Sequence, residues 1–370
     1  MNIKSNFKIL LTLTIFAFGI ASCGDDTPND PEYTVPDTYS FENVSYSGQT
    51  QRLAMLQEMK TYMETANTAG NSIDADKLKA MYANTANAGF TQTYDDSKQL
   101  KSKTFENQQA IFEGLFEDFE SASQSVIPAI NGSAGVQVSL DGLSAYFVNA
   151  NGLEYTQVIE KGLMGACFYY QATSVYFGSE KMDVDNETVE PGEGTAMEHH
   201  WDEAFGYLGV PIDFPSNTDG LNFWGKYINS RDALLGTNDK IMDNFLSGRA
   251  AISNDDLTTR DEAIIEIRDA WELASVGTAV HYLNTALENY NDDAIRNHAL
   301  SEAVAFVYAL QFNDGKKVTN ANVNEILTKI GGDSAFANMN FYTVSEADLN
   351  AAKDLIAGYY SEIESVKDDL

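Results

Sequence analysis

Cysteine is scarce in this chain: Cys23 and Cys167 are the two in 370 residues. Cys23 falls at the end of an apparent leader, so Cys167 is the thiol that remains in the folded part, and an internal disulfide is excluded. Cys167 stands between Ala166 and Phe168 in an apolar run, which favours a small core residue over a nucleophile. We therefore expect packing, not cross-linking, to stabilise the fold.

Basic residues are also few, with 23 Lys and Arg against 55 Asp and Glu and a formal net charge of −32. A chain this acidic repels nucleic acid and anionic phospholipid surfaces. The charge fits either a cation as partner or solubility alone, and the composition does not separate the two.

Proline is confined to seven positions, none of them inside a stretch with helical periodicity, as an all-α chain requires. Sustained alternation of apolar and polar residues is missing, so any strands should be short. Apolar residues instead recur every three or four positions, and Asp74 has the place of an N-cap. The pattern predicts helices at 53–63, 74–81, 105–119, 154–177, 258–289, 291–312 and 345–366. We predict an all-α fold.

Residues 1–22 have the form of a leader. Lys4 and Lys8 precede the apolar run 9–20, which is too short to span a bilayer comfortably, and Ala21-Ser22-Cys23 follows. This arrangement resembles a bacterial lipoprotein signal, which implies cleavage before Cys23 and a lipid on that cysteine. The acidic residues directly after Cys23 resemble the surface-export signal of some Gram-negative lipoproteins. The expected address is an outer membrane, facing the periplasm or the cell surface.

After the leader, we expect a tether, two helical bundles and two loops that are rich in proline or glycine. Residues 23–38 are polar and carry three prolines, as a tether would. Residues 39–368 then suit two packed helical bundles, about 39–177 and about 198–368, with loops at 128–152 and 178–197. The second loop contains Asp183-Val184-Asp185-Asn186-Glu187, but Thr188 and Gly194 replace the glycine and glutamate that a calcium loop needs. A solvated acidic loop is the better interpretation.

The chemistry-bearing stretch runs from Met197 to Tyr207 and holds two of the four histidines. On a helix, His199 and Glu203 are four residues apart and His200 and Glu203 three apart, so both imidazoles share a face with one carboxylate. The spacing fits a metal half-site, and it fits equally a histidine–glutamate contact that only satisfies buried polar groups. We leave both interpretations open.

A second copy of this pattern indicates an internal duplication. His199 to Ala204 aligns with His298 to Ala303, so that His298 and Glu302 repeat the histidine–glutamate spacing. If the duplication is real, a pseudo-twofold axis could bring both pairs to one surface between the bundles. His281 stands alone on an apolar face, and we assign it to the core. The helices expected before these two aligned segments also match each other, at a constant offset of 112. The matched residues are Glu154, Glu160, Gly165 and Tyr170 over Glu266, Glu272, Gly277 and Tyr282.

His200-x-x-Glu203 in an all-α, lipid-anchored protein resembles the imelysin-like proteins, whose hallmark is Gly-x-His-x-x-Glu. The segments 161–166, 199–207 and 223–227 are similar to an uncharacterised lipoprotein family of Gram-negative bacteria related to the imelysins. The resemblance implies two helical bundles with the motif near their interface, and a connection to iron uptake. Here Glu198 stands where the motif has glycine.

These observations predict an exported lipoprotein that binds a divalent transition metal, iron or zinc, through His199, His200, Glu203, His298 and Glu302. Other iron-uptake components are the expected partners, besides the membrane reached through Cys23. One alternative is an imelysin-type metallopeptidase, although the chain lacks a His-Glu-x-x-His helix. Another is a metal-free scaffold that binds protein or glycan.

Overall fold

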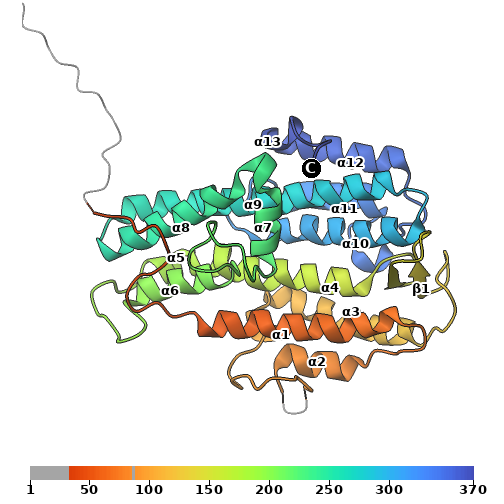
Figure 1. Ribbon diagram of the computed structural model, residues 1–370, viewed down its shortest axis with the longest axis horizontal. Helices are drawn as coiled ribbons and strands as arrows, with labels where there is room; N and C mark the ends of the chain where they lie inside the picture. The colour runs from red at the N-terminus through yellow and green to blue at the C-terminus, as the bar shows by residue number, and fades with distance from the viewer. Residues whose placement is uncertain (1–32, 86–87) are drawn as a thin grey trace, which may run out of the picture. The chain divides into compact units, whose positions relative to one another are not determined.

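A computed structural model describes residues 33–85 and 88–370 (Figure 1). Over this part of the chain the fold is all-α with one small hairpin, as the sequence predicts. The α-helices are α1 (Ser47–Met63), α2 (Ala75–Ala83), α3 (Glu106–Ser123), α4 (Tyr155–Leu163), α5 (Ser179–Met182), α6 (Ala196–Gly206), α7 (Trp224–Leu235), α8 (Thr237–Ser253), α9 (Leu257–Glu288), α10 (Asp293–Ala309), α11 (Asn320–Gly331), α12 (Glu346–Tyr359) and α13 (Ser361–Glu364). Short 3-10 turns lie at Glu64–Asn67, Lys101–Lys103, Leu310–Phe312 and Phe336–Asn338.

Several helices begin at a residue whose side chain caps them. The Asp74 carboxylate accepts the backbone N–H of Lys77 at 3.1 Å, which confirms Asp74 as the N-cap of α2. Asp292 caps α10 in the same manner. At the C-terminal end of α11, Gly332 has a φ of 80°, a left-handed conformation that glycine adopts without strain.

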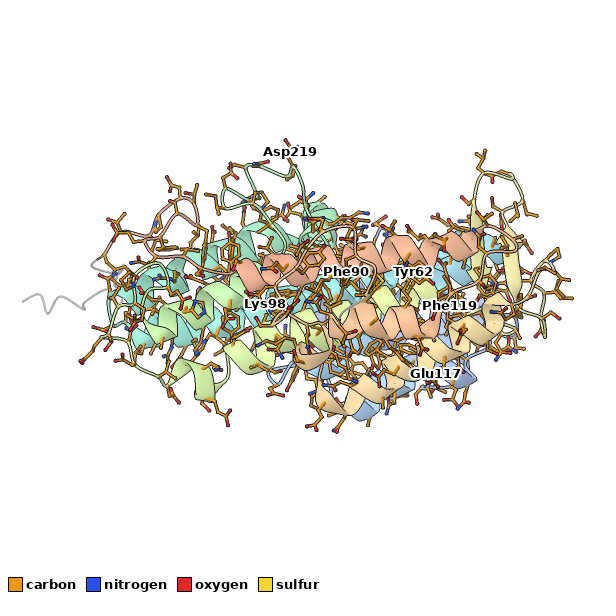
Figure 2. All side chains as sticks on the ribbon, turned by 90° about the horizontal axis from the view of Figure 1, so that it is seen from below. Tyr62, Phe90, Lys98, Glu117, Phe119 and Asp219 are labelled. Carbon is orange, nitrogen blue, oxygen red and sulfur yellow. The ribbon has the colours of Figure 1, made fainter. Side chains whose placement is uncertain are left out.

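Amphipathic helices pack around α9. On α3, Phe119 is buried while Glu117, two residues away, is exposed, and Figure 2 labels both. Helix α9 is 32 residues long and is covered by α7, α8, α10 and α12. Trp271 on this helix contacts the Trp224 ring at 5.9 Å between centroids, so the two indoles anchor the centre of the core.

Helix α4 continues into two π-helical turns, Met164–Tyr169 and Gln171–Tyr176. The sequence predicts one helix over 154–177, and the structure confirms its extent but not its regular winding. Cys167 lies in the first of these turns, fully buried, and burial raises the pKa of its thiol to about 12. This is the inert core cysteine that the sequence predicts.

Two strands form an antiparallel hairpin, β1 (Gly135–Val138) and β2 (Ala145–Val148), with Val136 opposite Phe147. The hairpin lies within the predicted loop 128–152. Phe147 is buried, and its backbone N–H donates to the side chain of Asn67 at 2.8 Å, which fixes the hairpin beside the end of α1.

Residues Val35–Leu370 form one compact unit. Within it α4 packs on α10, and α6 packs on both α1 and α8 (Figure 1). The division into bundles at about 39–177 and 198–368, and the internal duplication, stay predictions. Cys23 and the leader lie outside the described residues. In the part that the structure describes, no helix is both long and apolar enough to cross a membrane.

Candidate functional site

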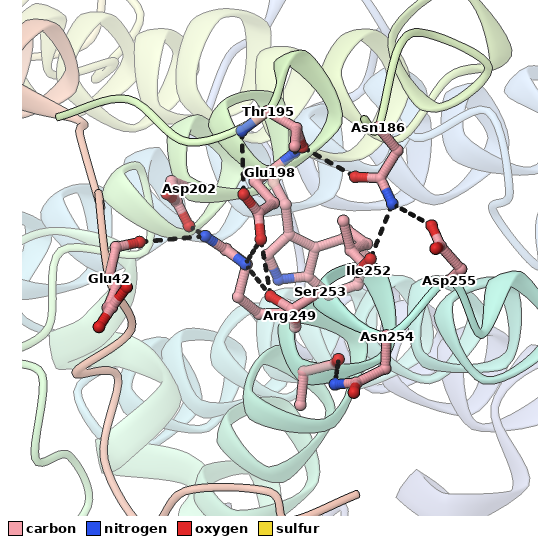
Figure 3. A network of polar contacts seen from close by, with 12 residues as sticks. Glu42, Asn186, Thr195, Glu198, Asp202, Arg249, Ile252, Ser253, Asn254 and Asp255 are labelled. Carbon is pink, nitrogen blue, oxygen red and sulfur yellow. Dashed lines mark hydrogen bonds and ion pairs between the residues drawn. The ribbon is translucent and has the colours of Figure 1, made fainter. Parts of the chain in front are cut away.

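Helix α6 begins with a capping box. The hydroxyl of Thr195 accepts the backbone N–H of Glu198 at 3.2 Å, and the Glu198 carboxylate accepts the backbone N–H of Thr195 at 2.9 Å. Asn186 holds the preceding loop against α8, because its amide donates to the carbonyl of Ile252 and to Asp255, both at 2.8 Å (Figure 3). The start of α6 is therefore fixed from two sides.

One face of α6 is structural. Arg249 on α8 donates to Asp202 at 3.0 Å and to Glu198 at 2.5 Å, as Figure 3 shows. Tyr39 also donates to Asp202, at 2.7 Å, and burial raises the pKa of this carboxyl to about 6. Glu198 and Asp202 thus fasten the N-terminal segment and α8 to α6, so neither carboxylate is available as a ligand.

The other face carries His199, His200 and Glu203, which we call the α6 triad. Nδ1 of His200 lies 3.3 Å from Oε2 of Glu203, and Nε2 of His199 lies 3.9 Å from the same oxygen. The three side chains are between 16% and 27% exposed, so they are open to solvent on one side. As the sequence predicts, both imidazoles converge on one carboxylate.

The second oxygen of Glu203 is held from two other elements. Oε1 accepts from the Gln49 amide of α1 at 2.9 Å and from the Tyr176 hydroxyl at 3.0 Å. Burial alone would raise the pKa of Glu203, but the hydrogen bonds from His200 and Gln49 and the nearby His199 outweigh burial and lower the pKa to about 2. Glu203 is therefore an ionised carboxylate with a fixed orientation.

Tyr176 reaches Glu203 from the last π-helical turn of the long helix. Its hydroxyl also accepts from Lys103 at 3.1 Å and from Gln49 at 3.3 Å. Burial lowers the pKa of Lys103 and raises the pKa of Tyr176. π-Helical turns are rare and concentrate at functional sites, which fits their position here, directly behind Glu203.

His199 makes the weakest contacts of the three residues of the triad. The 3.9 Å from its Nε2 to Glu203 exceeds a hydrogen bond, and among the described residues its buried Nδ1 has no hydrogen-bond partner. Nε2, and not the buried Nδ1, is therefore the nitrogen of His199 that could share a ligand with Glu203.

A cleft of about 300 Å³ opens beside the two histidines. The acidic loop lines it with Asp185, Glu190 and Glu193, no Lys or Arg lines it, and Glu203 lies outside its lining. Among the described residues that line the cleft, no cationic side chain would repel a cation. The three carboxylates would attract a cation.

The donor types of the α6 triad, and one of its spacings, can be compared with those of a metal site. Imidazole and carboxylate are the ligands of zinc and of non-haem iron, and two ligands about 2.1 Å from one tetrahedral ion lie about 3.4 Å apart. The observed 3.3 Å for His200 and Glu203 matches this separation, and 3.9 Å for His199 requires a shift of about half an ångström. Across residues 33–85 and 88–370, no group of three or more His, Cys, Asp or Glu side chains is placed so that it could hold a metal ion.

The second histidine–glutamate pair is placed differently. Nδ1 of His298 lies 2.7 Å from Glu154, and Glu302 lies 2.8 Å from Nζ of Lys161. Both partners come from α4 and its N-cap, whereas the partners of Glu203 come from α1 and the π-helical turn. In the described residues no contact joins His298 or Glu302 to the α6 triad, so the structure does not bring the two pairs together.

The acidic loop has a structural use for one of its carboxylates. Asp185 accepts the backbone N–H groups of Glu187 and Thr188, both at 3.2 Å, and so closes a turn on itself. Asp185 therefore stabilises the backbone turn that begins at this residue.

Sequence reasoning missed Gln49 and Tyr176. Gln49 lies 154 positions before Glu203, and no local pattern marks it as its partner. Tyr176 sits in an apolar run where π-helical winding leaves no periodic signal. His281 on α9 is only half-buried, so its assignment to the core was wrong, and among the described residues no hydrogen bond or ion pair joins its side chain to the triad.

A family model described as "Domain of unknown function (DUF4856)" matches residues 36–361. No curated protein and no solved structure gives a significant match to the chain.

Proposed function

The chain belongs to the family described as Domain of unknown function (DUF4856), and from the geometry of the α6 triad we propose that it binds a divalent transition metal. One observation carries the proposal: two imidazoles face a single oxygen of Glu203, while Gln49 and Tyr176 hold the other oxygen. Metal sites commonly hold their ligands through such outer hydrogen bonds, which orient a ligand without competing for it.

His200 and Glu203 would supply the first two ligands, and His199 the third after a small rotation toward them. A carboxylate of the facing loop, Glu190 or Glu193, could complete the shell from across the cleft. The proposed site does not include His298 and Glu302, because His298 pairs with Glu154 and Glu302 pairs with Lys161. The proposal is therefore narrower than the set of five residues that the sequence suggests.

We further propose that the site serves metal acquisition outside the cytoplasm. The support is the leader, which resembles a lipoprotein signal ending at Cys23, and the resemblance of His200-x-x-Glu203 to the imelysin motif. In this proposal a lipid on Cys23 holds the protein at the outer membrane, facing the periplasm or the cell surface, and iron or zinc is the bound ion. The imelysin-like assignment belongs to the same proposal.

Elemental analysis of the full protein, purified from its membrane without chelators, tests the metal. We expect close to one equivalent of a transition metal in the wild type, and much less in Glu203→Gln, which keeps the shape of the side chain but removes its charge. His281→Gln is the matched control and should keep the metal. Equal metal content in wild type and Glu203→Gln would refute the site.

The lipid anchor has its own test. Acyl chains contribute about 0.8 kcal/mol per buried CH₂, so several chains together hold a protein on a membrane. Cys23→Ser should therefore abolish labelling by a fatty-acid probe and release the protein into the soluble fraction. Membrane retention of this variant would contradict the anchor and leave the metal site untouched.

A further inference from the structure

Three basic side chains lie together at the start of α1 without an acidic partner. They are Arg52 on α1, Lys98 in the loop that precedes the turn Lys101–Lys103, and Lys103 on that turn, and we call them the basic cluster. Among the described residues none of the three forms an ion pair with Asp or Glu, whereas Lys101 pairs with Glu113 at 2.6 Å. Cations held together without a counter-charge repel one another, so an anion between them would be stabilising.

Arg52 and Lys98 meet over Gly48, in the first turn of α1. A methyl group added at Gly48 would lie 3.2 Å from Nη1 of Arg52 and 3.3 Å from Cε of Lys98. Figure 2 labels Lys98 beside the start of this helix. Arg52 is 5% exposed, and its Nε donates to the carbonyl of Gln99 at 2.8 Å. That bond orients the guanidinium, and in the described residues Nη1 and Nη2 donate no hydrogen bond.

Lys103 approaches the same turn from its other side. Its Nζ donates to the Tyr176 hydroxyl at 3.1 Å, and this hydroxyl also accepts from Gln49, the residue after Gly48, at 3.3 Å. Burial lowers the pKa of Lys103, and the charge of Arg52 lowers it further, against the opposite effect of Glu203. The cations of the cluster therefore act on one another across the first turn of α1.

The start of α1 adds positive potential to the cluster. No side chain caps this 17-residue helix, and its first turn contains no Asp or Glu. The N–H groups at a helix N-terminus carry partial positive charge, so Arg52 and Lys98 are unfavourable beside them. Asp95 attracts Lys98, but its carboxylate accepts the backbone N–H of Ser97 at 2.8 Å and forms no ion pair with the cluster in the described residues.

These donors suit a small oxyanion. A guanidinium fork binds two oxygens of a carboxylate or phosphate, and ammonium groups and helix N–H groups bind further oxygens. Because salt screens charges beyond about 8–10 Å, the local cations act on such a ligand more strongly than the distant carboxylates do. We propose that the basic cluster and the first turn of α1 bind a phosphate or carboxylate group of a small soluble ligand. The site uses no residue of the α6 triad and does not depend on the proposed function.

Gly48 allows a direct test, because an aspartate there would bring its own carboxylate to Arg52 and Lys98. Both neighbouring atoms end flexible side chains, which move by a few tenths of an ångström, so the variant should fold. Gly48→Asn has the same shape without the charge. In calorimetric titrations of the full protein with inorganic phosphate and with malonate, at constant ionic strength, wild type and Gly48→Asn should bind at least one probe. Gly48→Asp should bind that probe about tenfold or more weakly than Gly48→Asn.

Two lysine variants test the site without touching the helix. Lys98→Gln should weaken the bound probe about tenfold, whereas Lys226→Gln, which removes an exposed lysine on α7, should leave binding unchanged. A preference for phosphate or for malonate in the wild type identifies the group that the site accepts.

Three results would overturn the proposal. They are no binding of either probe by the wild type, equal binding by Gly48→Asp and Gly48→Asn, and equal binding by Lys98→Gln and Lys226→Gln, which would mean an adventitious ion only. Circular dichroism verifies that each variant is folded, and Lys98→Gln keeps the test valid if Gly48→Asp does not fold. The titrations contain no metal, so a negative result leaves the proposed metal site untouched.

Discussion

Nδ1 of His298 lies 2.7 Å from Oε2 of Glu154 and joins α10 to the residue that caps α4. The Tyr146 ring of β2 stacks on this imidazole at 4.1 Å between centroids. The pair therefore connects the hairpin, α4 and α10. The same contact explains why His298 takes no part in the α6 triad.

This pair should make stability depend on pH. Burial would lower the pKa of His298, but the Glu154 carboxylate outweighs burial and raises it above 6.5. A raised imidazole pKa contributes stability that is fully present below about pH 6.5 and is lost as the pH rises through the folded-state value. His298→Gln should therefore reduce the free energy of unfolding more at about pH 5.5 than at about pH 9, in urea titrations.

His281 supplies a control of opposite sign. Burial lowers the pKa of His281, so its protonation opposes folding and its contribution to stability grows as the pH rises. His281→Gln should cost less at the acidic pH than at the alkaline one. The same pH trend in both variants would contradict this assignment of the two histidines.

Lys161 is a buried cation whose removal should be costly. It is 2% exposed and lies 2.7 Å from Glu160 and 2.8 Å from Glu302. Lys161→Met would leave Glu302 in the core without its counter-charge and Glu160 with Lys60 alone, at 3.5 Å, which costs about 3–5 kcal/mol in such sites. Chemical denaturation measures the loss. Lys101→Met breaks a pair with Glu113 that is about one-third exposed to solvent and should change stability much less, so equal losses in the two variants would refute the role of Lys161.

Gly248 on α8 is required for close packing. A Cβ at this position would collide with the indole of Trp201 and come within 3.0 Å of the Ala263 methyl carbon. Gly248→Ala should therefore destabilise the fold by about 1–3 kcal/mol, because the core cannot expand without strain. Gly114→Ala on α3 meets nothing within 4 Å and should stabilise the protein by about 0.5–1 kcal/mol through helix propensity. Thermal unfolding compares the two, and a loss of stability in both would contradict the packing argument.

Periodicity and capping were enough to predict most of the fold. Asp74, the predicted helices and the absence of proline from helix interiors all agree with the structure. No predicted helix covers α7, α8 or α11. Only Gly236, in a left-handed conformation, separates α7 from α8. In α11 the buried Val323, Ile326, Leu327 and Ile330 do recur at helical spacing, so this helix was predictable from the sequence.

From the sequence, the candidate site was predictable only for the residues that lie on one helix. The spacing of His199, His200 and Glu203 places them on one face of α6, and the structure shows that arrangement. Which carboxylates the fold uses for other purposes depends on contacts distant in sequence: Arg249 engages Glu198 and Asp202, and Lys161 engages Glu302. Those contacts leave no mark in the local pattern, so the sequence alone cannot show which carboxylates are already engaged elsewhere.

Calorimetric titration of the full protein, stripped of metal, with zinc and with ferrous iron under anaerobic conditions tests the metal site most directly. The account predicts one saturable site in the wild type that weakens in acid, because protons compete for the imidazole nitrogens. Glu203→Gln, His199→Gln and His200→Gln should each weaken binding about tenfold or more, while His281→Gln binds as the wild type does. If the wild type takes up neither metal at neutral pH, and Glu203→Gln is merely less stable, the α6 triad is part of the architecture and the account is wrong.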